Sequence, residues 1–326
     1  MEMAPSSPSG KNGSEPSKVE NKDREQELKV WEQHAGVIKM QRFDYAASSS
    51  LLSRSHSAFL VTCPIKREKS ATKEAMSILD KCIIDWNNRY RRDKDDFPAE
   101  EVDSKRRKMI SSDEEGNQFQ VVDGGQVPGV SLSLVKLTKS GLLLFALPDD
   151  ACIDVNEVVS NVFQFLEKET LDKPKWCHRI FPVQATCCLN SKDLKATVSK
   201  LAGRFMDKHF KNHAEHIKFA IAYNRRGLED LPPKKIQNNG EKGIDLSLLD
   251  RTNCFNTVAA AVKDVAPDSS VDLKSPELSI FVELLPLSGI LVTSLVAAVS
   301  ILPRNFVSVK PRLCIKPLTS DSSAKI

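Results

Sequence analysis

The stretch that decides the fold of this chain is WCHRIFPVQATCCL, residues 176–189. It is rich in Ile, Phe, Val and Thr, which suit a half-buried β-strand. Pro182 has no N–H to donate to a ladder, so we expect this strand at a sheet edge or with a bulge. Two basic residues, His178 and Arg179, stand just before that break. A basic residue on an edge strand is most often a solvated charge that discourages edge pairing. The basic segments that follow give these two a possible role.

Helical periodicity flanks this strand on both sides. Apolar residues with the spacing of one helix face predict helices over residues 154–168 and 191–213. Further along, a strand at 217–223, a helix at 248–265 and a hairpin at 279–297 are expected. Alternating helices and strands predict an α/β domain, with a mixed sheet because the hairpin adds antiparallel strands. The predicted buried stripe of the second helix is Leu194, Val198, Leu201 and Phe205.

The N-terminal part predicts a smaller α/β module at residues 56–149. A buried strand at 58–65 and a helix at 72–86 precede two strand-like runs, 129–135 and 141–147. Between them, residues 87–117 form a charged linker with the basic tetrad Lys105–Lys108, which is either an import signal, an RNA-contacting loop or a solvated run. The polar segment 1–55 is predicted to be a disordered tail, and residues 313–326 are predicted to be a second tail.

Composition narrows the class of protein. The 326 residues carry a net charge of only +4, so local clusters of charge, and not the whole chain, must indicate nucleic acid. The eight cysteines form no Cys-x-x-Cys pair, and the polar N-terminus does not resemble a signal peptide. We therefore expect an intracellular protein with reduced thiols.

One apolar run, residues 280–302, has enough hydropathy to suggest a membrane span. Its turn residues Pro286-Leu287-Ser288-Gly289 interrupt it, and the flanks, 279–285 and 290–297, are rich in β-branched residues. The run is therefore predicted to be two strands and a four-residue turn, with no membrane partner.

Two motifs resemble the THUMP domain. The first is HRIFPV, residues 178–183, followed by ATC, residues 185–187, and it is similar to that family's central strand segment. The second is VDLKSP, residues 271–276, leading into IFVE, residues 280–283, and it resembles the family's VDL-x-x-P turn and following strand. The resemblance implies a THUMP-like domain at 150–312, with the smaller module as its ferredoxin-like companion. It also implies a stand-alone THUMP protein, a eukaryotic homologue that assists tRNA cytidine acetylation.

Local charge gives the candidate site. Residues 192–218 carry seven Lys or Arg against three acidic residues, and Lys200, Arg204 and Lys211 fall within roughly 40° on one exposed helix flank. Such a face is often just solvated, but it coincides with further cations before and after it, which favours a phosphate-binding surface. The predicted RNA-binding residues are His178, Arg179, Lys192, Lys195, Lys200, Arg204, Lys211, Lys218, Arg225, Arg226 and Lys274.

Other constellations are rejected as chemical sites. His209, His213 and His216 lack an intervening Glu and a further ligand, so no metal is expected. The pair Cys187-Cys188 lies about 30 Å along an extended strand from His178, too far for a thiolate–imidazole pair. No dinucleotide, P-loop, deaminase or nucleophile-elbow motif is present. We therefore expect no cofactor, no small-molecule substrate and no enzymatic activity.

Together, the family resemblance and the basic residues predict that the protein is a tRNA-binding adaptor. The resemblance implies that it presents tRNA to an RNA cytidine acetyltransferase, which forms acetylcytidine in the D-arm. Structured RNA would be recognised by shape, phosphates and its single-stranded end. Two alternatives stay open, a protein-interaction module with incidental basic patches and an enzyme with an unrecognised site. The tetrad Lys105–Lys108 favours a nuclear or nucleolar location, with the cytoplasm as the alternative.

Overall fold

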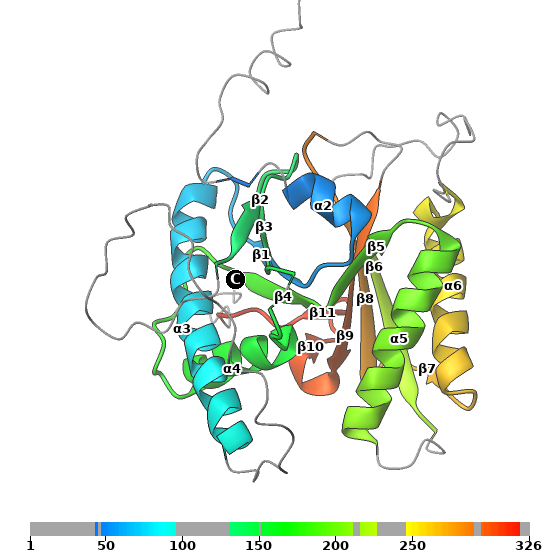
Figure 1. Ribbon diagram of the computed structural model, residues 1–326. Coiled ribbons are helices and arrows are strands. Elements are labelled where there is room, and N and C mark those ends of the chain that lie inside the picture. Colours follow the sequence, from blue (N-terminus) through cyan, green and yellow to red (C-terminus); the bar gives the residue numbers. More distant parts are fainter. Residues whose placement is uncertain are drawn as a thin grey trace, which may run out of the picture. The chain divides into compact units, whose positions relative to one another are not determined.

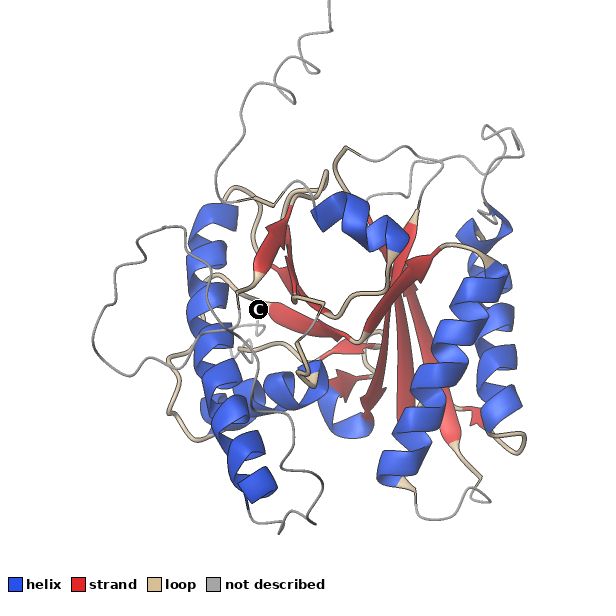
Figure 2. Ribbon diagram, in the orientation of Figure 1, coloured by secondary structure: helices blue, strands red, loops and turns tan. Residues whose placement is uncertain are grey.

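The computed structural model describes residues 43–44, 47–95, 131–149, 151–210, 216–226, 246–289 and 295–319, all within one compact unit, Gln41–Ile326. Two larger β-sheets with helices packed against them, and a two-stranded sheet near the C-terminus, make up the described part of this unit (Figures 1 and 2). The mixed α/β class expected from the sequence is confirmed. The tetrad Lys105–Lys108 and the predicted cation Lys211 lie outside the described residues.

The first sheet is an antiparallel ferredoxin-like module with strand order β2-β3-β1-β4. Its chain order, β-α-β-β-α-β, is the one that defines this motif. The sequence placed the end of the module at residue 149, but its last helix and strand follow that point. They belong to it because β4 pairs with β1 along its whole length, with Leu60 opposite Phe181. The elements are β1 Ala58–Thr62, α3 Glu68–Asp95, β2 Ser133–Val135, β3 Leu142–Ala146, α4 Val155–Glu167 and β4 Arg179–Val183.

The position of Pro182 follows the rule for proline in sheets. β4 is an edge strand, and among the strands that the structure describes its one hydrogen-bonded neighbour in this sheet is β1. The edge position tolerates a residue without an N–H, as predicted. The stretch 176–189 is nevertheless not one strand. It bends at Gln184 and continues as β5, Ala185–Cys188, in the second sheet.

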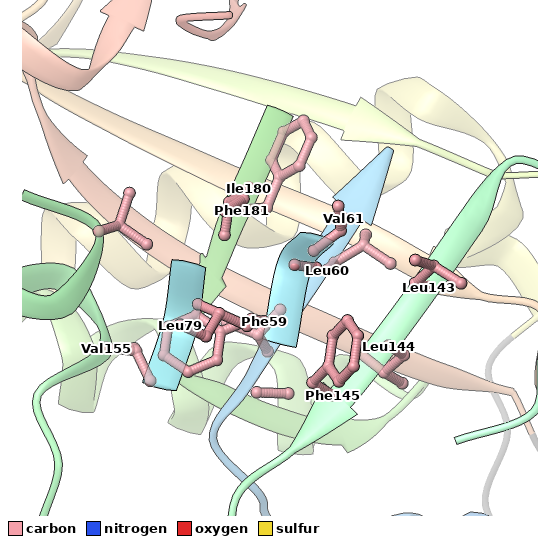
Figure 3. Packing of buried hydrophobic residues seen from close by; sticks show 14 of the residues in the cluster. Phe59, Leu60, Val61, Leu79, Leu143, Leu144, Phe145, Val155, Ile180 and Phe181 are labelled. Carbon is pink, nitrogen blue, oxygen red and sulfur yellow. The ribbon is translucent and has the colours of Figure 1, made fainter. Parts of the chain in front are cut away.

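The core of the first module is made of large apolar side chains on adjacent strands. Figure 3 shows Phe59, Phe145 and Phe181 packed among leucines of β1, β3 and α3. Each of these three rings is at most 1% exposed. At about 1.5–3 kcal/mol for burying each such side chain, this packing outweighs the poor hydrogen bonding of a short edge strand.

The second sheet is mixed, with strand order β5-β9-β8-β6-β7. β6 runs parallel to β7 and β8, whereas β9 is antiparallel to both β8 and β5. The helices α5 and α6 lie side by side against this sheet (Figure 1). The elements are α5 Ser191–His209, β6 Lys218–Asn224, η1 Leu246–Leu249, α6 Arg251–Val265, β7 Ser270–Val271, β8 Leu278–Leu285 and β9 Val296–Pro303.

The apolar run at 280–302 contributes the two antiparallel strands β8 and β9, as predicted, but the segment between them, 286–295, is longer than the expected four-residue turn. Its second strand begins at Val296, later than the expected 290–297. Pairing decides this start, because Leu285 at the end of β8 lies opposite Val296. Within the described residues, no helix is long and apolar enough to cross a membrane.

Both predicted tails contain ordered structure. Residues 1–55 were expected to be disordered, but α2, Ala47–Ser53, buries Leu51 to 1% exposure. Residues 313–326 were expected to be a tail, but β11, Cys314–Ile315, pairs with β10, Val307–Ser308, after the short helix η2, Arg304–Phe306. Neither segment has a strong local signal, so packing against the sheets accounts for their order.

The two sheets meet along β4 and β9. Ser300 on β9 donates its hydroxyl to the carbonyl of Pro182 at 2.5 Å. Gln184, at the bend between the sheets, accepts from the Ile301 amide through Oε1 at 2.6 Å. The rings of Phe181 and Phe281 form an edge-to-face pair with centroids 6.2 Å apart. The second sheet thus contributes side chains to the core of the first.

Candidate nucleic-acid interface

The helix α5 begins at a well-formed cap. Asn190 accepts from the Asp193 amide at 2.7 Å, and its own side-chain amide donates to the Asp193 carboxylate. An Asn at this position satisfies an amide that the helix itself leaves unpaired. The buried stripe is the predicted one, with Ala202 and Met206 added. Because this stripe packs inward, the charged residues of α5 are directed to its outer side.

Three of the predicted cations on α5 are exposed, and we call them the α5 cations: Lys192, Lys200 and Arg204. The predicted Lys195 differs, since its Nζ lies 2.9 Å from the Asp264 carboxylate of α6. An exposed pair of this kind is worth little to stability, but it reduces the charge available to a phosphate. The predicted surface on α5 is therefore narrower than the sequence suggested.

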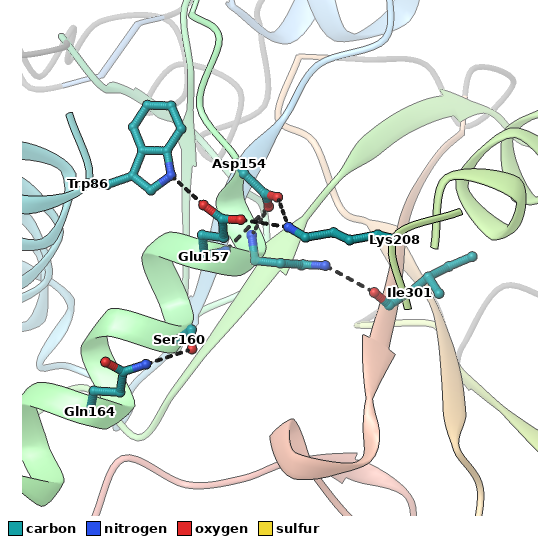
Figure 4. Close-up of polar contacts among 8 residues, drawn as sticks. Trp86, Asp154, Glu157, Ser160, Gln164, Lys208 and Ile301 are labelled. Carbon is teal, nitrogen blue, oxygen red and sulfur yellow. Dashed lines mark hydrogen bonds and ion pairs between the residues drawn. The ribbon is translucent and has the colours of Figure 1, made fainter. Parts of the chain in front are cut away.

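A pocket of about 710 Å³ lies beside Arg204, between the start of α4, the end of α5 and η2. We call it the α4–α5 pocket. Figure 4 shows its polar wall, where Lys208 reaches Asp154 at 3.0 Å and Glu157 at 2.6 Å. Trp86 donates its indole N–H to the other oxygen of Glu157 at 2.8 Å. These partners are 51 to 71 residues apart in the chain, so sequence reasoning had no signal for them.

The charged groups on this wall of the pocket, Lys208 and its carboxylate partners, stabilise each other's charged forms. Burial raises the pKa of Glu157, but the hydrogen bonds from Lys208 and Trp86 outweigh it and leave the pKa below its ordinary value. Burial lowers the pKa of Lys208, and its two carboxylate partners reverse this and raise it. Burial, and then the charge of Lys208, lower the pKa of His209, so this ring is neutral at physiological pH. Arg204 is therefore the cation of this pocket with charge available for a ligand.

His178 and Arg179 lie at the start of β4, close to the C-terminal hairpin. The carbonyl of His178 accepts from the Leu318 amide at 2.9 Å. The Arg179 side chain is half-buried and donates through Nε to the Ile315 carbonyl at 3.1 Å. These contacts account for part of the hydrogen-bonding capacity of Arg179, while the His178 side chain is exposed.

Arg226 has a structural role that the sequence did not predict. Its guanidinium forms an ion pair with Glu283, which is 1% exposed, and lies 4.9 Å from the ring centroid of Phe181. Asn224 donates to the other oxygen of Glu283 at 2.7 Å. The charge of Arg226 balances this buried carboxylate, and its contact with RNA stays a prediction. Arg225 beside it is half-buried.

The last two predicted cations meet at the turn before β8. Lys218 is exposed, with its Nζ 3.8 Å from the Asp272 carboxylate. The amide of Lys274 donates to the same carboxylate at 2.8 Å, which leaves its side chain exposed. The predicted residues thus lie in several places, among them the exposed flank of α5, the start of β4 beside the C-terminal hairpin, and the turn before β8.

The rejected nucleophile pair has no catalytic geometry. Cys187 lies on β5, in the second sheet, whereas His178 precedes β4 in the first. Burial raises the pKa of Cys187 to about 12, so its thiol is protonated at neutral pH. Among the described residues, no three His, Cys, Asp or Glu side chains come together as metal ligands do.

The sequence of residues 194–286 matches the family model of the THUMP domain. The matched segment begins in the first turn of α5 and contains β6, α6, β7 and β8. The chain therefore contains a THUMP domain, and the VDLKSP motif at 271–276 lies inside it. The HRIFPV motif at 178–183 lies ahead of the match. A THUMP domain indicates tRNA binding in tRNA modification.

Two solved structures are similar to this chain. One is a 4-thiouridine synthetase–RNA complex with bound ATP, at 8% identity and a TM-score of 0.32, covering 76% of this chain and 42% of that one. The other is TrmN from Thermus thermophilus, at 13% identity and a TM-score of 0.31, covering 81% and 47%. The chain spans less than half the length of either protein. No curated protein sequence matches it.

These comparisons correct one expectation from the sequence. The chain was expected not to be an enzyme, because no catalytic motif was recognised. That conclusion is wrong, since the similar structures include a 4-thiouridine synthetase. A missing motif does not decide whether a chain with this fold catalyses a reaction.

Proposed function

We propose that this protein binds tRNA through its THUMP domain and presents it to an RNA cytidine acetyltransferase that forms acetylcytidine in the D-arm. The observation that carries tRNA binding is the THUMP match at 194–286, which contains two of the α5 cations, Lys200 and Arg204. The acetyltransferase partner follows from the resemblance to stand-alone THUMP proteins.

The arrangement at α5 supports recognition of an RNA backbone. Arg204 stands at the rim of the α4–α5 pocket, with Lys200 one turn earlier on the same helix. Exposed cations on a rigid helix bind phosphates without reading sequence. The pocket beside them offers room for an unpaired nucleotide at the end of such an RNA.

Titration with tRNA at several salt concentrations tests this binding. The double variant Lys200→Gln, Arg204→Gln should flatten the log–log salt dependence by about 0.7–0.9 per cation removed. The matched control is Lys69→Gln, Lys73→Gln, which removes the same charge from exposed positions on α3. Failure of the wild-type chain to bind tRNA at moderate salt would refute the proposed function.

The acetylation role is tested in cells and with purified proteins. Loss of this protein should lower acetylcytidine in tRNA, and the wild-type gene should restore it better than the Lys200→Gln, Arg204→Gln variant. Adding the purified chain to a cytidine acetyltransferase with acetyl-CoA, ATP and tRNA should raise the rate of acetylcytidine formation. Unchanged acetylcytidine in both experiments would leave a tRNA-binding protein with a different partner.

We also propose a nuclear location, because the tetrad Lys105–Lys108 resembles an import signal. Deleting these four residues should move a tagged protein toward the cytoplasm. An unchanged distribution on microscopy would end this part of the proposal without affecting the tRNA claim.

A further inference from the structure

A second hollow, of about 610 Å³, collects basic side chains beside the C-terminal hairpin. We call it the C-terminal pocket. Its cations come from separate segments: Lys274 from the turn before β8, Arg304 from η2, and Lys310 and Lys316 from the hairpin β10–β11. The sequence analysis named only Lys274. The run of Lys and Arg in 304–316 was a usable signal, but it was divided between a predicted domain end and a tail.

The backbone around this pocket is fixed by hydrogen bonds. The amide of Lys316 donates to the Phe306 carbonyl at 2.8 Å, and Phe306 itself is buried edge-to-face against Phe163 of α4. The Ser308 hydroxyl donates to the Lys310 carbonyl at 2.8 Å. Asp272 holds the Lys274 turn through two amides. The cations are therefore presented by a pre-organised frame, which lowers the ordering cost of binding.

The charge in this pocket is not balanced from within. None of its lining residues is acidic, and all four cationic side chains are exposed. Across the described part of the chain, no ion pair involves any of these four residues. The α4–α5 pocket is the opposite case, because Lys208 is held there by two carboxylates. Asp272 beside Lys274 offsets part of this charge, but a cluster of four cations with no carboxylate in its lining attracts an anion.

The two pockets adjoin. Asn305 of η2 lines both of them, and Arg204 lines the first. Arg179 donates to the carbonyl of Ile315, the residue next to Lys316, so another cation borders the same hairpin. An extended chain of phosphates could therefore pass over η2 from one pocket to the other.

We infer that the C-terminal pocket binds the phosphate backbone of the RNA that the THUMP domain recognises. This inference rests on the proposed function. The four exposed cations of the C-terminal pocket are spread over an open hollow. This arrangement suits the successive phosphates of an RNA backbone better than one small enclosed anion. Lys and Arg on a rigid hairpin would then extend the RNA surface beyond the matched domain, past residue 286.

The test is the double variant Arg304→Gln, Lys316→Gln, titrated with tRNA at several salt concentrations. Each lost cation should weaken binding about fivefold at roughly 0.15 M salt and lower the log–log slope by about 0.7–0.9. The control Lys69→Gln, Lys73→Gln should change binding less than about twofold. A thermal melt of each variant should match that of the wild type, because the substituted side chains are exposed.

The outcomes separate this inference from the proposed function. Suppose that the wild type binds tRNA and that the α5 double variant (Lys200→Gln with Arg204→Gln) binds it more weakly. If the hairpin double variant (Arg304→Gln with Lys316→Gln) then binds tRNA as tightly as the wild type, the inference alone is overturned. If the wild type does not bind tRNA, both the proposed function and this inference fail. Saturable binding of inorganic phosphate that leaves tRNA affinity unchanged would replace the inference with a small-anion site.

Discussion

Arg226 lies where the two sheets approach each other, with Glu283 of β8 on one side and the Phe181 ring of β4 on the other. Its backbone has a φ of 43°, in the left-handed region that non-glycine residues rarely adopt. Tertiary contacts must hold a residue in such a conformation. The buried carboxylate and the aromatic ring provide them.

Replacing Arg226 by Ala should therefore destabilise the protein. The change leaves Glu283 buried without its cation, which typically costs about 3–5 kcal/mol, and toward the lower end here because Asn224 still donates to it. Urea unfolding measures the loss. Lys195→Ala is the control, since it breaks an exposed pair and should cost less than about 1 kcal/mol. Equal stability of Arg226→Ala and wild type would contradict the structural role.

Glu74 on α3 holds the segment that enters β4. Its carboxylate accepts hydrogen bonds from three backbone amides, those of Lys175 at 2.7 Å, Trp176 at 2.8 Å and Cys177 at 2.7 Å. Burial raises the pKa of Glu74, but these hydrogen bonds together outweigh it and leave the pKa below its ordinary value of 4.5. The charged form is thus favoured by folding.

The substitution Glu74→Gln should lower stability by about 1–3 kcal/mol at neutral pH, because hydrogen bonds to a charged group are lost. The folded-state pKa is depressed, so the stabilising contribution is present above the ordinary value of 4.5 and is lost as pH falls through the folded-state value. The difference between wild type and Glu74→Gln should consequently shrink below about pH 4.5. A difference that stays constant from neutral to acidic pH would show that the charge plays no part.

At the scale of the element, α5 has one side that packs in the core and another that is exposed and carries the α5 cations. Phe205 is 6% exposed, and its ring lies against the His209 ring at 4.3 Å between centroids. Arg204, its neighbour in sequence, is exposed at the α4–α5 pocket. The helical period of 3.6 residues places these adjacent residues on different sides.

We expect Phe205→Ala to cost about 3–5 kcal/mol, because it removes a core ring and leaves a cavity. Binding of tRNA should fall with the folded fraction and should return at temperatures where the variant is folded. Arg204→Ala should show the reverse pattern, with a stability change of no more than about 0.5 kcal/mol and weaker tRNA binding. Thermal melts and tRNA titrations of both variants decide this. A stable Phe205→Ala variant would contradict the packing described for α5.

At the scale of the molecule, the joint between the two sheets is continuous in both core and hydrogen bonds. Ser300 and Gln184 join β9 to the end of β4, and Asn156 of α4 donates to the Ile301 carbonyl at 3.1 Å. Separating the sheets would expose the apolar pair Phe181 and Phe281. Each sheet therefore depends on the other to bury its apolar side chains.

This joint predicts one cooperative unfolding transition for the part of the chain that the structure describes. In a Trp31→Phe background, fluorescence of Trp86 and Trp176 reports the first module, because both belong to it. Thiol labelling of Cys254, which is 0% exposed on α6, reports the second sheet when it is read from the Cys254 peptide by mass spectrometry, apart from the other cysteines. The two probes should give coincident midpoints in urea. Two separate midpoints would show that the sheets unfold independently.

The sequence alone predicted the elements whose signal is local. The buried stripe of α5, the apolar pair β8–β9 and the edge position of Pro182 all follow from period, turn residues and a missing N–H, and all were confirmed. The VDLKSP motif led to the THUMP domain that the family match confirms. The sequence analysis divided the chain at residue 149, whereas α4 and β4 complete the first sheet beyond that point. The full set of RNA-binding residues stays a prediction.

Only the tertiary structure decided which strand joins which sheet and which cation is already paired. The bend at Gln184 sends β4 and β5 to different sheets, although the sequence through them reads as one strand. Arg226 and Arg204 look alike in the sequence, yet one balances a buried Glu283 and the other is exposed. Strand partners and ion pairs are set by contacts between residues far apart in the chain. Local pattern carries no record of those contacts.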